Sequence, residues 1–185
     1  MSQVYLLAAG RGKRAGGPKA WQDYNGEPLL KKHIDFLLTR LDPQRITISI
    51  QADWVSQCRR LCERANWVPA DPDAPAMDSL IRLLKAVRMI KWSFIYHVDH
   101  PVWEPRLFDA LLSRTAGAEA HAFAPTYNGR RGHPVLVSHG LGPDMLALDP
   151  QKDRLDAFLR TRRVEEVPVD FPCVIENWNE SVPRK

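Results

Sequence analysis

Residues 4–19 read VYLLAAGRGKRAGGPK, an apolar run of strand length that leads into a loop with four glycines and four cationic side chains. An uninterrupted apolar run is typical of a strand buried on both faces of a parallel sheet. Glycine lets a backbone turn tightly and approach a ligand, and successive N–H groups in such a turn form an anion site. Because the loop directly follows the first predicted strand, the sequence predicts a phosphate site, with a nucleoside triphosphate as guest, rather than a solvated surface turn.

Three types of phosphate loop compete for this stretch. A Walker loop needs Ser or Thr after its lysine to hold magnesium, whereas Lys19 is followed by Ala20. Residues 10–15 formally meet the dinucleotide fingerprint, but that motif requires a helix to open at once. Here the next helical pattern begins only at Leu29 or Leu30. The remaining type is a long loop that wraps a triphosphate and ends in a reaching lysine, and we expect Lys19 to be that lysine.

Composition bounds the class of protein. A chain of 185 residues with 44% hydrophobic residues can bury one good core, so we expect one domain over residues 1–185. The net charge of +4 suits an enzyme that collects polyanions. We expect no nucleic-acid partner, because no basic tail or aromatic-basic interleaving is present. The sequence shows no signal peptide or transmembrane span, and its three cysteines form no metal-ligand pattern. We therefore expect a cytoplasmic protein with reduced cysteines and no membrane partner.

Strands and helices alternate along the chain, which predicts a three-layer α/β domain. Its sheet should be twisted and mostly parallel, with helices on both faces. Predicted strands cover residues 4–9, 45–51, 92–98, 119–125, 134–138, 164–169 and 174–175, and predicted helices cover residues 30–41, 53–64, 80–87, 104–112 and 154–162. Asp53 is a candidate N-cap, and strand 45–51 should have one wetter face through Thr47 and Ser49. Residues 69–75 contain three prolines and two aspartates, which indicates a loop.

Ligands of open α/β sheets bind beyond the carboxyl ends of the strands. Three candidate segments follow strand ends: the loop after Ala9, Asp99 after Val98, and Asn179 near the last strand. A carboxylate at the end of an apolar strand needs a partner, and Mg²⁺ prefers oxygen ligands. Asp99 is therefore a candidate metal ligand, with the N-cap of the following helix as the alternative.

The loop at residues 7–19 resembles the signature loop of nucleotidyltransferases with a glycosyltransferase-A-like, or nucleotide-diphospho-sugar transferase-like, fold. Within them the chain is most similar to the molybdenum cofactor cytidylyltransferase and guanylyltransferase group. The similarity continues in family order through residues 26–30 (GEPLL), 77–80 (MDSL), 98–101 (VDHP), 127–136 (YNGRRGHPVL) and 177–179 (NWN). The Gly-His-Pro segment at 132–134 is the more specific pointer to the cofactor-directed branch.

This resemblance implies that Asp99 holds a catalytic Mg²⁺ and that Asn179 is the second metal-side group, with Asn177 as the competing position. Glu180-Ser181 stand where the family has Thr-Pro. Metal ligation by His97 or His100 stays open as an alternative.

Positioning and charge neutralisation carry most of the catalysis in phosphoryl transfer. Arg14 and Lys19 are therefore the candidate catalytic cations, aimed at the α-phosphate and the leaving pyrophosphate. Arg11 and Lys13 should be exposed and less important. The resemblance further implies a set of residues that contact the nucleotide: Leu7, Ala8, Ala9, Gly10, Gly12 and Ser79. It places His133 on the acceptor side, although a surface histidine and a polar helix-start residue are the alternatives for His133 and Ser79.

The sequence thus predicts an enzyme that transfers NMP from an NTP to a phosphorylated acceptor and releases pyrophosphate. An acceptor phosphate is already ionised, which fits the absence of a clear Ser-His or Cys-His pair. By resemblance, Ala-Ala at positions 8 and 9 favours CTP. The same resemblance favours a molybdopterin-type acceptor, with an acceptor molybdoenzyme or its chaperone as a possible protein partner. The alternatives are a sugar-, polyol- or isoprenoid-phosphate acceptor, and a non-catalytic nucleotide-binding relative.

Overall fold

Strand β1 (Ser2–Leu7) lies inside an eight-stranded sheet with the order β10-β7-β9-β6-β1-β4-β5, in which β8 pairs with β7. The computed structural model describes residues 2–13 and 16–179. β1 pairs in parallel with its neighbours β4 (Ile46–Gln51) and β6 (Trp92–His97), and β4 pairs in parallel with β5 (Asn66–Ala70). On the other side of β6 the sheet is mixed. β9 (Val135–Ser138) runs antiparallel between β6 and β7 (Ala122–Tyr127), and β10 (Val164–Pro168) pairs in parallel with β7.

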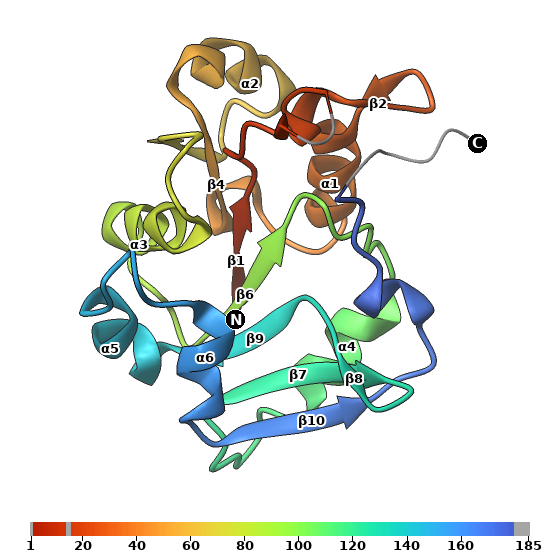
Figure 1. The fold of residues 1–185 in the computed structure, drawn as a ribbon. Helices are drawn as coiled ribbons and strands as arrows, with labels where there is room; N and C mark the ends of the chain where they lie inside the picture. Colours follow the sequence, from red (N-terminus) through yellow and green to blue (C-terminus); the bar gives the residue numbers. More distant parts are fainter. Residues whose placement is uncertain (1, 14–15, 180–185) are drawn as a thin grey trace.

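Helices cover both faces of this sheet (Figure 1). One face packs against α1 (Leu29–Leu38), α2 (Val55–Leu61) and α4 (Pro105–Ser113), and the other against α3 (Ala76–Ala86), α5 (Gly142–Leu146) and α6 (Leu155–Arg160). Because side chains alternate along a strand, β1 sends Val4 and Leu6 into the first core and Tyr5 and Leu7 into the second. The predicted three-layer α/β fold, with a mostly parallel sheet, is confirmed.

Short elements complete the fold. A small hairpin, β2 (Asp23–Tyr24) and β3 (Glu27–Pro28), precedes α1, and β8 (Arg130–Arg131) follows the turn after β7. Single 3-10 turns cover Lys19–Trp21, Pro43–Arg45, Ala52–Trp54, His139–Leu141 and Pro172–Ile175. Within the two described ranges, no helix has both the length and the apolar character that crossing a membrane requires.

The structure corrects three predicted elements. Residues 69–75 are not wholly a loop, because β5 extends to Ala70 and includes Pro69. β5 is the edge strand of the sheet, where a residue without an N–H is tolerated. Residues 174–175 form part of a 3-10 turn and not a strand. The predicted helix 53–64 begins as a 3-10 turn and ends at Leu61, and Trp54 rather than Asp53 occupies the N-cap position of α2.

The prediction that one face of β4 is more exposed to solvent is also wrong. Thr47 and Ser49 are both buried, because helices cover both faces of the sheet at this point. Their hydroxyl groups are satisfied within the protein. Ser49 Oγ accepts a hydrogen bond from the Ala8 N–H at 3.2 Å, and Thr47 Oγ1 accepts one from Asn66 Nδ2 at 3.5 Å.

Candidate functional site

The carboxyl ends of β1 and β6 meet at one edge of the sheet. Leu7 and His97, the last residues of the two strands, are paired in register, and the Val98 N–H donates to the Leu7 carbonyl at 3.0 Å. The chain leaves β1 for β4 on one side and returns as β6 on the other side. This is the kind of switch point at which open α/β sheets bind ligands. The loop after β1 and the residues after β6 therefore face the same space.

The loop after β1 folds back on itself at Gly12. Gly12 has a φ of 64°, and the Gly17 N–H donates to the Gly12 carbonyl at 3.2 Å. A Cβ atom at position 12 would lie 1.9 Å from the Gly17 carbonyl oxygen, so no larger residue fits there. The loop then runs through Pro18 into the 3-10 turn that begins at Lys19. Arg14, the other predicted catalytic cation, lies outside the described residues.

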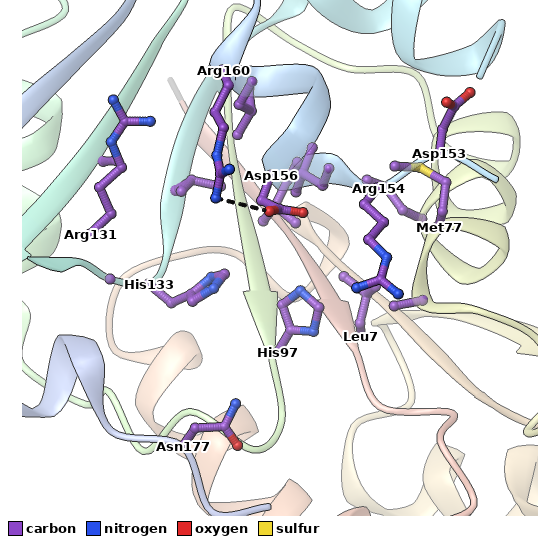
Figure 2. A pocket seen from close by; sticks show the side chains of 18 of the residues that line it. Leu7, Met77, His97, Arg131, His133, Asp153, Arg154, Asp156, Arg160 and Asn177 are labelled. Atoms are coloured by element: carbon purple, nitrogen blue, oxygen red, sulfur yellow. Dashed lines mark hydrogen bonds and ion pairs between the residues drawn. The ribbon is translucent and has the colours of Figure 1, made fainter. Parts of the chain in front are cut away.

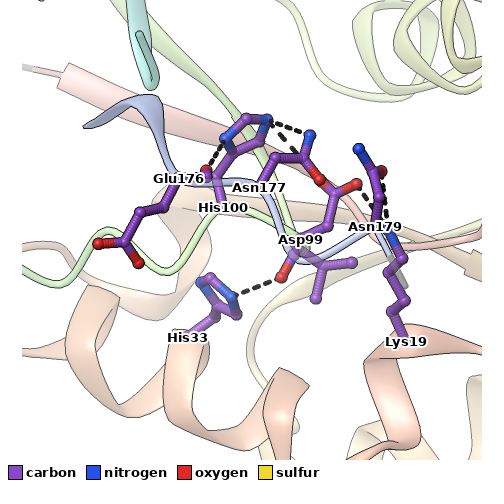
Figure 3. A network of polar contacts seen from close by, with 8 residues as sticks. Lys19, His33, Asp99, His100, Glu176, Asn177 and Asn179 are labelled. Carbon is purple, nitrogen blue, oxygen red and sulfur yellow. Dashed lines mark hydrogen bonds and ion pairs between the residues drawn. The ribbon is translucent and has the colours of Figure 1, made fainter. Parts of the chain in front are cut away.

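Lys19, Asp99 and Asn179 come together at this edge of the sheet (Figure 3). Lys19 Nζ donates to Asp99 Oδ2 at 2.9 Å and to Asn179 Oδ1 at 3.2 Å. Two side-chain oxygens thus converge on one cationic group. Asp99 follows the end of β6 as predicted, whereas Asn179 follows a 3-10 turn and not the predicted strand. Carboxylate and amide oxygens also suit Mg²⁺, which needs few protein ligands when substrate phosphates and waters complete its shell. The residues present therefore fit a nucleotide-assisted magnesium site.

The charge of Asp99 depends on its neighbours. Its side chain is 21% exposed, and burial of the carboxyl group raises its pKa. Positive charge on His97 and His100 in acid, and the hydrogen bond from Lys19, outweigh burial and leave the pKa of Asp99 below its ordinary value. Asp99 is thus ionised at neutral pH. The Lys19 ammonium group is the cation in direct contact with it.

Three histidine side chains lie near Asp99, with His100 Nε2 at 3.9 Å from Asp99 Oδ1. Within the described residues, the Lys19 side chain donates to Asp99 and Asn179 and not to these rings. The imidazole rings of His97, His100 and His133 lie 4.1 to 5.8 Å apart between centroids. Burial lowers the pKa of His97 to about 4 and the pKa of His133 to about 2, and it also lowers the pKa of His100. All three rings are therefore neutral at pH 7. No group of three His, Cys, Asp or Glu side chains in residues 2–13 and 16–179 is arranged to hold a metal.

The two asparagines of the C-terminal segment have different neighbours. Asn177 Nδ2 donates to His100 Nε2 at 3.3 Å, and His100 Nδ1 donates to the Glu176 carbonyl at 2.8 Å. Asn179, by contrast, contacts Lys19. Of the two competing positions, Asn179 is the one beside Lys19 and Asp99.

Glycine at position 132 allows this C-terminal segment to lie against the turn that carries His133. The His133 N–H donates to the Val174 carbonyl at 2.8 Å. A Cβ atom on Gly132 would lie 2.3 Å from that same carbonyl oxygen. The glycine of the Gly-His-Pro motif is therefore needed because two backbone segments pack closely here. His133 packs beside His97 and His100 and is not a free surface side chain.

A fourth histidine, His33 of α1, forms a hydrogen bond with the backbone directly after the end of β6. Trp103 Nε1 can only donate, and it lies 3.2 Å from His33 Nδ1. His33 Nδ1 is therefore the acceptor, and Nε2–H donates to the Val98 carbonyl at 2.9 Å. Burial lowers the pKa of His33 to about 4, so the ring is neutral and its tautomer is fixed by the two hydrogen bonds.

Because His33 is buried, we expect the folded protein to lose stability in acid. In the unfolded chain His33 takes up a proton near pH 6.5, whereas the folded protein resists protonation down to about pH 4. The unfolded state therefore binds more protons between these values, and the free energy of unfolding falls as the pH falls through this window. The expected loss is roughly 3 kcal/mol from His33 alone.

Urea denaturation at several pH values from 7.5 to 4 measures this slope. His33→Gln, which keeps a donor and an acceptor, should flatten the slope between pH 6.5 and 4. Replacement of the exposed His139 by Gln is the matched control and should leave the slope as it is in the parent. An unchanged slope in His33→Gln contradicts the assignment.

Two neighbouring cavities open at the site. The first, about 430 Å³, lies at the loop and is lined by Lys19 and Asp99, by Asn179, and by the predicted nucleotide-binding residues Leu7, Ala9, Gly10, Gly12 and Ser79. The structure does not bring Ala8 to this cavity. Its side chain is buried in the core on the α1 side, and its N–H is bonded to Ser49. The predicted contact of Ala8 with the nucleotide therefore rests on its carbonyl group.

The second cavity is about 860 Å³ and shares Leu7, Ala76, His97 and Asn179 with the first. Figure 2 shows His97 and His133 turned toward it, and Arg154 extending into it from the start of α6. Arg131 and Arg160 also line it, but they pair with Glu166 at 2.6 Å and Asp156 at 3.5 Å. The side chain of Arg154 has no ion pair or hydrogen bond with the part of the chain that the structure describes. No sequence motif predicted a role for these arginines, although Arg131 lies in the segment 127–136 that carries the family resemblance.

The loop cations have a carboxylate partner that was not predicted. Arg11 and Lys13 are exposed, as predicted, and both pair with Asp73, at 2.5 and 3.1 Å. Their hydrogen bonds lower the pKa of Asp73 to about 2. The acidic residues of the loop after β5 were a signal that the sequence offered.

Solved structures with the same fold are known. Rv0371c from Mycobacterium tuberculosis H37Rv has a TM-score of 0.77 and 20% identity, with 97% of this chain and 94% of that chain covered. A second structure of Rv0371c is a complex with manganese. Molybdopterin-guanine dinucleotide biosynthesis protein A from Archaeoglobus fulgidus has a TM-score of 0.65 and 18% identity over 92% and 84% of the two chains. The bifunctional IspDF of Campylobacter jejuni has a TM-score of 0.77 and 13% identity over 95% and 51%.

Comparison with curated protein sequences gives no match. Comparison with protein-family profiles does, and the matched profile is that of the MobA-like NTP transferase domain, over residues 4–167. This range includes the glycine-rich loop, Asp99 and His133, and it reaches from β1 to β10. The chain therefore belongs to the family of MobA-like NTP transferase domains.

Proposed function

We propose that this transferase moves NMP from an NTP, with CTP preferred, to the phosphate of a molybdopterin-type acceptor, and releases pyrophosphate. The observation that carries the proposal is the convergence of Lys19, Asp99 and Asn179 at the loop-side cavity, where Asn179 also borders the neighbouring larger cavity. One cavity has the glycine-rich loop as its wall and suits a triphosphate. The other is large enough for a second substrate, which would then meet the nucleotide beside Asp99.

Each residue has a role that follows from its chemistry. Asp99 and Asn179 would hold Mg²⁺ through their side-chain oxygens, together with the nucleotide. When bound, the metal offsets negative charge on the α-phosphate. Lys19 binds the triphosphate and neutralises charge that develops on the leaving pyrophosphate, and it needs no proton transfer to do so. The manganese complex of Rv0371c supports a divalent cation in this fold.

The acceptor side supports an anionic substrate. Arg154 extends into the second cavity without an ion-pair partner among the described residues, and its guanidinium group suits a phosphate. The His97 and His133 rings, with pKa values lowered to about 4 and about 2, are too weakly basic to serve well as a general base. None is needed when the nucleophile is a phosphate oxygen that is already ionised. The Archaeoglobus fulgidus protein supports a molybdopterin acceptor, which implies an acceptor molybdoenzyme or its chaperone as a partner.

Pyrophosphate release with a panel of NTPs and acceptors tests this function. CTP with molybdopterin and Mg²⁺ should give the highest turnover. Sugar, polyol and isoprenoid phosphates represent the alternative acceptors. If only one of those acceptors gives turnover, it takes the place of molybdopterin in the proposed reaction. If no pair of NTP and acceptor gives turnover, the protein binds nucleotides without catalysing transfer.

The choice of nucleotide gives a further prediction. Ala9 is 3% exposed and lines the loop-side cavity directly after the end of β1, so its methyl group would crowd the second ring of a purine. A misfit base leaves polar groups unpaired at about 1–3 kcal/mol each, or roughly 5- to 150-fold in kcat/KM. CTP should therefore exceed GTP and ATP by at least about tenfold. Ala9→Gly should raise GTP use and barely change CTP use, and equal use of GTP by the parent would overturn the preference.

A further inference from the structure

The segment 176–179 is tied to the residues after β6 mainly through its backbone. The Trp178 N–H donates to the Asp99 carbonyl at 2.9 Å, and the Glu176 carbonyl accepts from His100 Nδ1 at 2.8 Å. The Asn179 side chain, which faces Lys19, extends from the same segment (Figure 3). The position of Asn179 relative to Asp99 therefore depends on how firmly Trp178 is held.

Trp178 is held by two other aromatic rings. Its ring centroid lies 5.6 Å from that of Tyr24 and 5.8 Å from that of Trp103, and Tyr24 and Trp103 are 5.2 Å apart. Tilted and edge-to-face contacts at these distances are favourable. The three rings come from the β2–β3 hairpin, the segment before α4 and the C-terminal segment. We call these three residues the aromatic triad.

The aromatic triad also reaches the other side of Asp99. Trp103 donates through Nε1 to His33, and His33 in turn donates to the Val98 carbonyl at 2.9 Å. Trp178 meanwhile donates to the Asp99 carbonyl. The carbonyl groups on both sides of the Asp99 side chain are therefore held by one connected set of residues. Trp178 itself lines neither of the two cavities at the candidate site.

We infer that Trp178 is a positioning residue, which the aromatic triad locks in place so that the Asn179 and Asp99 oxygens converge where the divalent cation binds. This inference rests on the proposed function, because it assigns the cation to Asp99 and Asn179. Outer groups that orient metal ligands typically contribute roughly 10- to 100-fold to metal affinity. Loss of the Trp178 ring should therefore weaken binding of the metal–nucleotide complex.

Affinity for Mn²⁺ with a non-hydrolysable CTP analogue, measured by calorimetry and by the Mn²⁺ resonance spectrum, tests the inference. Trp178→Ala should weaken Mn²⁺–nucleotide binding at least about tenfold and leave binding of the metal-free analogue unchanged. Trp178→Phe, which keeps an aromatic ring, should stay within about threefold of the parent. Tyr24→Ala removes a triad ring from the small hairpin and should weaken Mn²⁺–nucleotide binding in the same direction, so the inference stays testable if Trp178→Ala fails to fold.

Trp67→Ala is the matched control. Trp67 is another half-buried indole, on the edge strand β5, and it donates through Nε1 to the Cys62 carbonyl at 2.9 Å. Its loss should lower the melting temperature without weakening Mn²⁺–nucleotide binding. Equal weakening in Trp67→Ala would reduce the effect to general destabilisation and overturn the inference. Unchanged Mn²⁺–nucleotide affinity in Trp178→Ala would also overturn the inference. If Trp178→Ala does not fold, unchanged affinity in Tyr24→Ala would overturn it. A parent protein that binds the analogue no better with Mn²⁺ than without it would remove the metal assignment of the proposed function and the inference with it.

Discussion

Asp99→Asn should lower Mg²⁺-dependent nucleotidyl transfer by roughly 1,000-fold or more, because it removes the charge that attracts the cation and keeps the side-chain shape. The variant should fold, since an amide oxygen can still accept the hydrogen bond from Lys19. Affinity for the nucleotide without metal should change little. The magnesium-dependent increase in affinity should disappear. Calorimetry with and without Mg²⁺, together with pyrophosphate release, measures both effects.

Asp109→Asn is the control for Asp99→Asn. Asp109 is an exposed carboxylate of α4 that pairs with Arg40 on the surface. Its replacement should leave turnover and metal dependence as they are in the parent. If Asp99→Asn still binds the magnesium–nucleotide complex like the parent, Asp99 has a structural role alone, in the connection between β6 and α4.

Lys19→Ala should lower kcat by roughly 100- to 1,000-fold, the range for the loss of one preorganised charge donor. The Lys19 side chain is 13% exposed and pairs with Asp99, so its loss leaves this carboxylate without its cation and should also lower the melting temperature. Steady-state kinetics should show most of the loss in kcat if Lys19 acts on the leaving pyrophosphate. Lys31→Ala, which removes an ammonium group from surface pairs of α1, is the matched control and should be silent. Near-normal pyrophosphate release by Lys19→Ala would remove Lys19 from the proposed mechanism.

The sequence predicted the layers of this fold because the apolar periodicity of its central elements is strong. β1 and β6 are mostly apolar, and they lie side by side in the middle of the sheet. Local patterns failed where tertiary context decides. Pro69 argues against a strand except at an edge, and the sequence does not reveal that β5 is the edge. Ser49 reads as exposed by alternation, yet it is buried where its hydroxyl group binds the Ala8 N–H.

Much of the candidate site was also predictable, since strand ends of a parallel sheet meet at one edge. This rule brings together Lys19 and Asp99, which are 80 residues apart in sequence. Asn179 follows a 3-10 turn rather than a strand, so the rule does not account for its position beside Lys19. The contacts that hold them are long-range and carry no local signal. Nothing in residues 20–30 indicates that Tyr24 packs on Trp178, and nothing around position 154 indicates an arginine in the second cavity. The predicted roles of Lys19, Asp99 and Asn179 stay predictions until variants are measured.

Transfer of a radioactive label from [α-³²P]CTP tests the central claim most directly. With Mg²⁺ and a phosphorylated acceptor, the label should move into the acceptor product, and pyrophosphate should appear in equal amount, because the α-phosphate is the group transferred. The parallel reaction with [γ-³²P]CTP should leave its label in pyrophosphate. Movement of the γ-label to the acceptor, or no transfer of the α-label to any acceptor with any NTP, would contradict the account.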